Sequence, residues 1–184
     1  MPGESARSGS RIERVVLADG RTVIAKYLVR DEDLVLRATD DDGRLDRLWR
    51  AGVFDRMPVV IEHALLGVEA DGPDWLVVME DVADTLLADD RPVTRAESRR
   101  ILAAGAALHA AFDGADLPRI GAPGMLYRFL SPAMALAEAG GPNPLPGLVG
   151  RGWERFGDAV PHDVADAIAA IHADPDGFAA RYAG

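Results

Sequence analysis

Two β-type segments joined by a turn constrain the fold of this chain more than any other feature. Apolar and β-branched residues fill positions 12–17 and 21–28, and Asp19-Gly20 lies between the two runs. An Asp-Gly pair flanked in this way is the strongest short-range signal for a β-hairpin. We therefore expect the chain to begin its ordered part as a hairpin.

The second of these segments carries a lysine at its centre. Side chains alternate between the two faces of a strand, so Lys26 lies on the same face as Ile24 and Leu28. A lysine in line with apolar residues is explained if that face lines a cleft that receives an anion. Alternatively, Lys26 lies on a solvated edge, with its stem packed and its ammonium group in water. The strand alone leaves both interpretations open.

Composition limits the possible partners. The chain has 184 residues, enough for one large or two small domains with a buried core. Its formal net charge of −10 disfavours nucleic acid and anionic membranes, both of which need basic surface. The sequence contains 0 cysteines, which excludes disulfides and thiolate metal sites. With no apolar leader and no run of membrane-spanning length, we expect a cytoplasmic protein.

The first part of the chain is predicted to be a small antiparallel sheet with one helix. Residues 34–38 are expected to form a short strand, and residues 59–69 two more strand-like runs. The spacing of Leu45, Leu48 and Trp49 predicts a helix that begins after three aspartates at 40–42 and ends before Pro58. The continuous apolar run 75–79 predicts a buried strand.

The second part is predicted to be helical. After a linker at 88–92, Thr94 and Glu97 form a capping box at the start of a long helix. A loop is expected at 113–130, and further helices are expected at 133–139, 148–156 and 164–171. Asp174-Pro175 is expected to begin a last short helix. The predicted fold class is α+β, with a β-rich lobe over residues 1–83 and a helical lobe over residues 84–184.

Three motifs in a fixed order carry a resemblance to a known family. They are Val23-Ile24-Ala25-Lys26, the run from Leu76 to Val82, and Ala106-Ala107-Leu108-His109. The chain resembles the N-terminal portion of the aminoglycoside phosphotransferase family, which has a protein-kinase-like fold. The resemblance implies ATP and Mg²⁺ as cofactors and a small-molecule hydroxyl compound as the substrate.

The resemblance also implies roles for individual residues. The nucleotide-binding residues would be Ser8, Gly9, Ser10, Ile24, Lys26, Met79, Glu80 and Val82. Lys26 would pair with the phosphates of ATP and Ile24 would pack on adenine. The backbone of Glu80 and Val82 would meet the adenine edge, as in a kinase hinge. Ser8 to Ser10 would end a phosphate-covering loop, although residues 1–10 taken alone favour a flexible tail. Asp46 is a possible partner for Lys26.

The chain departs from the family in its catalytic half. Phosphoryl transfer needs a catalytic aspartate, an asparagine and a second metal-binding aspartate. His172-Ala173-Asp174 has the spacing of the first motif, but Ala179 stands where the asparagine is required, so Asp174 is interpreted as a helix cap. No catalytic residue and no metal ligand is assigned.

We therefore expect the N-terminal part of an ATP-dependent small-molecule phosphotransferase that is inactive alone. The alternative is a non-catalytic kinase-like domain that binds a partner. A hydrolase is disfavoured, since neither G-x-S-x-G nor H-E-x-x-H occurs. The sequence does not indicate the substrate or the oligomeric state.

Overall fold

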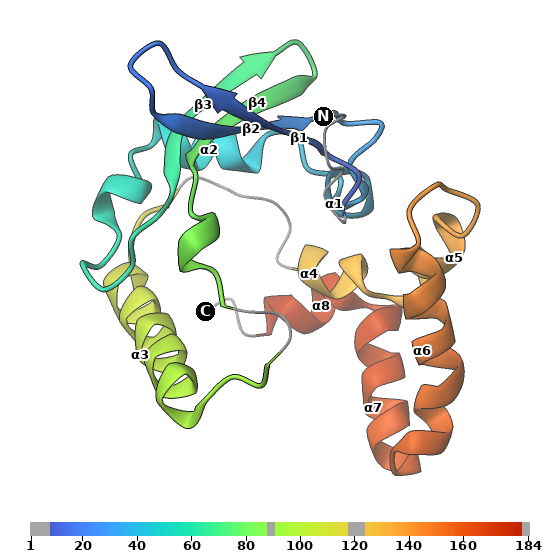
Figure 1. The fold of residues 1–184 in the computed structure, drawn as a ribbon. Coiled ribbons are helices and arrows are strands. Elements are labelled where there is room, and N and C mark those ends of the chain that lie inside the picture. Colours follow the sequence, from blue (N-terminus) through green and yellow to red (C-terminus); the bar gives the residue numbers. More distant parts are fainter. Residues whose placement is uncertain (1–7, 88–90, 118–123, 182–184) are drawn as a thin grey trace. The chain divides into compact units, whose positions relative to one another are not determined.

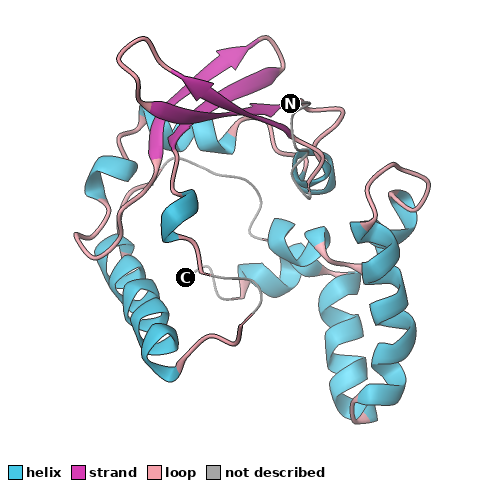
Figure 2. Cartoon of the chain, viewed as in Figure 1, coloured by secondary structure: helices cyan, strands magenta, loops and turns pink. Residues whose placement is uncertain are grey.

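The structure, a computed structural model, describes residues 8–87, 91–117 and 124–181 (Figure 1). A four-stranded antiparallel sheet is combined with helices, which confirms the predicted α+β class (Figure 2). The expected tail at 1–7, three residues of the expected linker (88–90) and part of the expected loop (118–123) lie outside the described residues. Within the described part of the chain, no helix is both long and apolar enough to cross a membrane.

The chain divides into two compact units, and each is built from separate stretches of sequence. The first contains Ile12–Tyr27 and Gly43–Ile120, and therefore most of the sheet. The second contains Glu4–Arg11, Leu28–Asp42 and Gly121–Gly184. The division expected from element types, at residues 83 and 84, stays a prediction.

The sheet consists of two hairpins laid side by side. Its strands are β1 (Arg11–Val16), β2 (Thr22–Leu28), β3 (Leu65–Asp71) and β4 (Asp74–Glu80). Their order in the sheet is β1-β2-β4-β3, so β2 and β4 are the central strands. The first hairpin is the one predicted from Asp19-Gly20, and Gly20 has the positive φ of 83° that such a turn requires.

One face of the sheet is buried. Val23 and Ala25 on β2 are 5% and 6% exposed, and Trp75 and Val77 on β4 are 9% and 2% exposed. Both pairs are spaced two residues apart, as expected for a strand that buries one face. Gly43 lies against Trp75: a Cβ at this glycine, whose φ is 106°, would approach Trp75 Cζ2 to 2.7 Å.

Four helical segments of different lengths belong to the first unit. Helix α2 (Arg44–Arg50) packs against β3. The 3₁₀ turns η1 (Phe54–Arg56) and η2 (Ala83–Thr85) follow α2 and β4. Helix α3 (Arg95–Phe112) begins with the predicted capping box: Thr94 Oγ1 accepts from Glu97 N at 3.2 Å, and Glu97 Oε2 accepts from Thr94 N at 2.8 Å.

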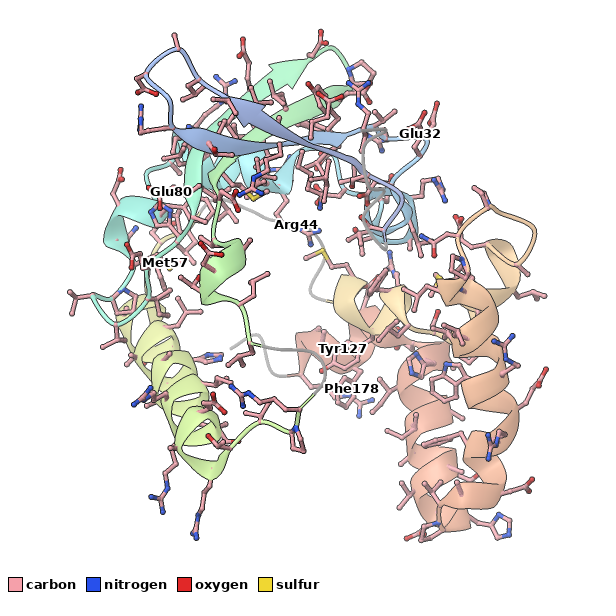
Figure 3. All side chains as sticks on the ribbon, viewed as in Figure 1. Glu32, Arg44, Met57, Glu80, Tyr127 and Phe178 are labelled. Carbon is pink, nitrogen blue, oxygen red and sulfur yellow. The ribbon has the colours of Figure 1, made fainter. Side chains whose placement is uncertain are left out.

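The second unit is helical. Its elements are α1 (Leu34–Thr39), α4 (Met125–Phe129), α5 (Pro132–Ala137), α6 (Leu145–Ala159), α7 (His162–Ala173) and α8 (Pro175–Ala180). Helix α4 contacts α1, α5, α7 and α8, and α6 packs on both α5 and α7. Leu34, Leu36 and Met134 are buried at 0%, 5% and 6% exposure. Tyr127 on α4 and Phe178 on α8 pack edge-to-face, with ring centroids 5.3 Å apart (Figure 3).

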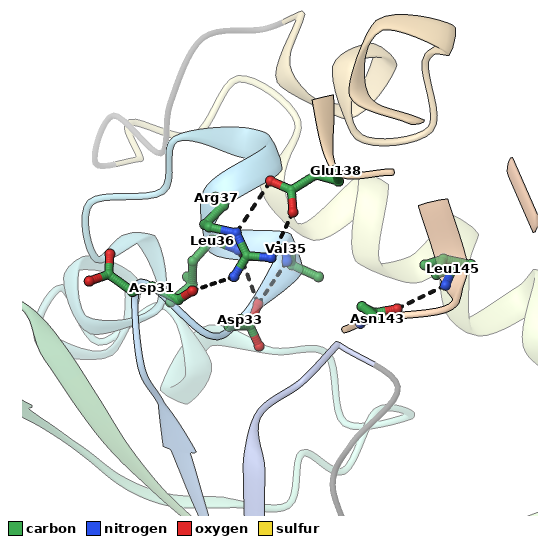
Figure 4. A network of polar contacts seen from close by, with 8 residues as sticks. All are labelled: Asp31, Asp33, Val35, Leu36, Arg37, Glu138, Asn143 and Leu145. Atoms are coloured by element: carbon green, nitrogen blue, oxygen red, sulfur yellow. Dashed lines mark hydrogen bonds and ion pairs between the residues drawn. The ribbon is translucent and has the colours of Figure 1, made fainter. Parts of the chain in front are cut away.

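An ion pair connects α1 to the end of α5. Arg37 donates from Nε and Nη2 to the two carboxylate oxygens of Glu138, at 3.2 and 2.7 Å (Figure 4). The side chains are 26% and 19% exposed. The hydrogen bond to Glu138 raises the pKa of Arg37 above its ordinary value. The contact holds segments about a hundred residues apart in the sequence.

Three local predictions were wrong. Residues 34–38 form helix α1 and not a strand, because the Asp33 side chain caps the N–H groups of Val35 and Leu36. Only one strand forms within 59–69, since Val59 is fully exposed and Pro58 accepts from Ile61 in a turn. Helix α4 lies inside the expected loop.

Candidate functional site

Strand β2 presents Lys26 on the less buried face of the sheet. Val23 and Ala25 fill the buried face, and Ile24 and Lys26 alternate with them and are half-buried. No residue that the structure describes forms a hydrogen bond or ion pair with the Lys26 ammonium group. Lys26 is therefore a cation on a rigid strand with no protein partner among the described residues.

Arg14 belongs to the same face as Lys26. Tyr27 Oη donates to Glu13 Oε2 at 3.1 Å, so these side chains share the opposite face of neighbouring strands. Because side chains alternate along both strands, Arg14 lies on the face of Lys26. Its guanidinium forms an ion pair with Asp81, the residue that follows β4. Asp81 Oδ2 lies within ion-pair distance of Arg14 Nη2, but the two groups do not form a hydrogen bond.

The segment after β4 is the one predicted to act as a hinge. Glu80 lies at the end of β4 (Figure 3), and its N–H donates to Ala64 O at 2.7 Å. The Val82 carbonyl accepts from Thr85 N at 2.9 Å and from Thr85 Oγ1 at 2.8 Å. The Val82 N–H donates to no described residue. One backbone donor is thus left for a ligand or for water.

Met79 belongs to the other side of the strand. It follows Trp75 and Val77 at intervals of two residues and is half-buried. In the register of the hairpin it pairs with Leu65, next to a bulge between Leu65 and Gly67. Alternation therefore places Met79 with the buried residues of β4 and not on the face of Lys26.

Asp46, the possible partner of Lys26, is paired within its own helix. Both of its carboxylate oxygens accept from Arg50 Nε at 2.8 Å, one turn later on α2. This hydrogen bond raises the pKa of Arg50 above its ordinary value. No ion pair joins Asp46 to Lys26 in this structure, and the four-residue spacing to Arg50 explains why the local partner is preferred.

The predicted phosphate loop is attached to the turn before α1. Ser8 O accepts from Leu34 N at 2.7 Å, and the buried hydroxyl of Ser10 donates to Asp33 Oδ2. A Cβ at Gly9, whose φ is 96°, would lie 2.5 Å from Glu32 O, so only glycine fits this approach. Ser8, Gly9 and Ser10 belong to the second unit, and the Ser8 carbonyl and Ser10 hydroxyl form hydrogen bonds within that unit.

The acidic and histidine residues do not form a metal centre in the described parts of the chain. Over residues 8–87, 91–117 and 124–181, no three histidine or acidic side chains converge on one point. Asp174 Oδ1 accepts from Gly177 N at 3.0 Å, which confirms its interpretation as the cap of α8. His172 packs edge-on against Trp153, with ring centroids 4.8 Å apart.

Sequence reasoning missed the Arg14–Asp81 pair. Its two members lie on β1 and after β4, so no local spacing relates them. The available signal was the alternation on β1, which places Arg14 on the face of Lys26. Comparison of the chain with protein-family models, with curated proteins and with solved structures finds no match.

Proposed function

We propose that the first unit is the nucleotide-binding part of an ATP-dependent phosphotransferase that acts on a small-molecule hydroxyl group in the cytoplasm. The observation that carries the proposal is the position of Lys26. It is a cation on β2 with no partner among the described residues, and β2 lies directly beside β4, the strand that leads into the Glu80–Val82 segment. A fixed lysine next to a hinge with a free backbone donor is the arrangement that kinase-like folds use for ATP.

The use of lysine at this position supports the proposal independently. Of the 20 lysine and arginine residues in the sequence, Lys26 is the sole lysine. Lysine is a compact point charge, whereas arginine is a planar fork that suits bidentate pairing. All the remaining members of this set of lysine and arginine residues are arginine. The choice of lysine at position 26 is consistent with a need for a point charge opposite phosphate oxygens.

In this proposal the residues have distinct tasks. Lys26 neutralises phosphate charge, Ile24 packs on the adenine ring, and the Val82 N–H donates to the adenine edge. Transfer of the γ-phosphoryl group depends on positioning and on charge neutralisation, which ATP-bound Mg²⁺ also supplies. The proposal assigns no residue of this chain as a ligand of Mg²⁺ or as the catalytic base.

A specific observation favours a second candidate, a non-catalytic domain that binds a protein partner. Ser10 is committed to Asp33 and Asp46 to Arg50, so two of the predicted nucleotide-site groups are engaged elsewhere. A fold that has lost nucleotide binding would retain Lys26 without a phosphate to pair with. The two candidates differ in whether ATP binds.

The test uses the single lysine. We expect ATP with Mg²⁺ to raise the melting temperature of the full chain, because a ligand that binds only the native state stabilises it. ATP should also protect Lys26 from an amine-acylating reagent, measured by mass spectrometry of the peptide that contains it. Lys26→Ala should abolish the thermal shift, and Lys26→Arg should not restore it fully.

The matched control is Arg151→Ala, which removes an exposed cation of α6 in the second unit that is not part of the proposed site. It should leave the shift intact. If ATP neither stabilises the wild type nor protects Lys26, the nucleotide-binding proposal is wrong and the partner-binding domain is favoured.

A further inference from the structure

One complete face of helix α3 (Arg95–Phe112) is not covered by any residue that the structure describes. The residues on this face, with the residue that ends the helix, are Arg95, Arg99, Leu102, Ala106, His109 and Asp113, which we call the α3 seam. All six are exposed, and Leu102 is 73% exposed. Their side chains form no hydrogen bond or ion pair with any described residue. The opposite face, which includes Leu108 and Phe112, is half-buried.

The seam has the spacing of a helix-pairing surface. Successive members are separated alternately by four and three residues, which is the heptad spacing that keeps one stripe facing a second helix. A single surface helix needs only one apolar stripe, toward its own core. The half-buried face already supplies that stripe, so the large exposed Leu102 is not explained by the fold of the first unit.

The order of residues in the seam is complementary to itself when reversed. If two copies of α3 lie antiparallel, Leu102 of one copy meets Ala106 of the second, a large side chain against a small one. Arg95 then meets Asp113 of the second copy, and Arg99 meets His109. A parallel pair would instead place Arg95 against Arg95 and Arg99 against Arg99, which is repulsive. The sequence therefore favours the antiparallel arrangement.

We propose that this protein forms a homodimer in which the α3 seams of two copies pair antiparallel about a two-fold axis. The two-fold axis repeats each contact, so every dimer has two Arg95–Asp113 contacts. Each arginine also lies next to the C-terminal end of the opposing helix, where the helix dipole favours a cation. Exposed Ala103 and Ala110 beside the seam permit close approach of the two helices.

The size of the surface sets the strength of the dimer. An 18-residue helix is roughly 27 Å long at a rise of about 1.5 Å per residue. One such helix buries less than the approximately 800 Å² per partner of a standard interface. The interface is therefore smaller than that of a standard stable complex, and the dimer population should depend on concentration.

Sedimentation velocity of the full chain over a wide concentration range tests the proposal. The wild type should shift from monomer to dimer as concentration rises. Arg95→Glu and Asp113→Arg should each raise the dissociation constant at least about tenfold, because each places like charges in contact twice per dimer. Leu102→Gln, which keeps a good helix former at an exposed position, should also weaken the dimer.

Mixing the two charge-reversed proteins gives the decisive result. In a heterodimer of Arg95→Glu with Asp113→Arg, every reversed charge faces a charge of opposite sign, so the mixture should dimerise more tightly than either protein does alone. The control is Arg100→Glu, which changes net charge equally but lies off the seam, and it should leave dimerisation unchanged. Circular dichroism verifies that each variant is folded.

Three results would overturn the proposal. A wild type that is monomeric at every concentration excludes the dimer. A dimer that is insensitive to Arg95→Glu, or equally sensitive to Arg100→Glu, excludes pairing through the seam. Failure of the two reversed proteins to associate with each other excludes the antiparallel arrangement.

Discussion

Replacement of Asp33 by alanine should destabilise the second unit more than any other single change of a carboxylate near α1. Asp33 is only 1% exposed, and its carboxylate accepts three hydrogen bonds. Oδ1 accepts from Val35 N at 2.8 Å and from Leu36 N at 3.0 Å, and Oδ2 accepts from the Ser10 hydroxyl. Asp33→Ala removes all three acceptor contacts at once.

The size of this destabilisation follows from the hydrogen-bond donors that lose the Asp33 carboxylate. Loss of an N-cap side chain costs about 1 kcal/mol, within a range of about 0.5–2 kcal/mol. The Ser10 hydroxyl, in a residue that is 1% exposed, then loses its charged acceptor and keeps only the Ser8 hydroxyl, 3.1 Å away, which costs about 1.5–3 kcal/mol more. We expect a decrease of roughly 2–4 kcal/mol in the free energy of unfolding. Helix α1 has 6 residues and cannot persist without its cap and its packing.

Urea denaturation followed by circular dichroism measures this decrease. The matched control is Asp31→Ala, which removes an exposed carboxylate in the same turn and should change the free energy of unfolding by less than about 0.5 kcal/mol. Ser10→Ala combined with Asp33→Ala should cost less than the sum of the single changes, because the two side chains share one hydrogen bond. Equal effects of Asp33→Ala and Asp31→Ala would refute the reasoning.

Two further predictions concern the first unit. Gly43→Ala should destabilise the protein by about 1–3 kcal/mol from backbone strain alone and by more in total, because a Cβ there also meets Trp75 at 2.7 Å. Gly72→Ala has a positive φ of 61° but open space, so thermal denaturation should show it to be the milder change, and equal effects would argue against the Trp75 contact. For Glu97, hydrogen bonds from Arg91 and then from Thr94 lower the pKa of the carboxyl well below its ordinary value. Its stabilising effect is therefore present above the pKa of the unfolded chain, about 4.3, and is lost as pH falls below that value. The melting-temperature difference between wild type and Glu97→Gln should shrink between pH 7 and pH 3 in thermal scans, and a difference that does not change with pH would contradict this assignment.

Local signals predicted much of the fold. The Asp19-Gly20 turn and the alternation along β2 gave the first hairpin, and Thr94 with Glu97 gave the start of α3. The failures occurred where a short apolar run is ambiguous. The mostly apolar run 34–38 is short enough to suit either a strand or a helix, and the decisive signal was the Asp33 cap just before it. Val59 has a high strand propensity but no neighbouring strand to pair with.

The candidate site was predictable only to the extent that strand alternation determines it. Alternation placed Lys26 opposite the buried Val23 and Ala25. The pairing of Asp46 with Arg50 was visible in the four-residue spacing, whereas the Arg14–Asp81 pair depends on the order of strands in the sheet. Contacts across strands and between distant segments follow from tertiary structure, which local patterns do not specify.

The contact between Arg37 and Glu138 has a consequence for how the chain folds during synthesis. The two residues are separated by 101 positions. Closing a loop of that length costs roughly 4 kcal/mol of chain entropy. A ribosome that adds about 5–20 residues per second needs roughly 5–20 s to reach Glu138 after Arg37. During that interval residues 28–42 have been synthesised but the helices that bury Leu34 have not. The segment is therefore accessible to chaperones and proteases.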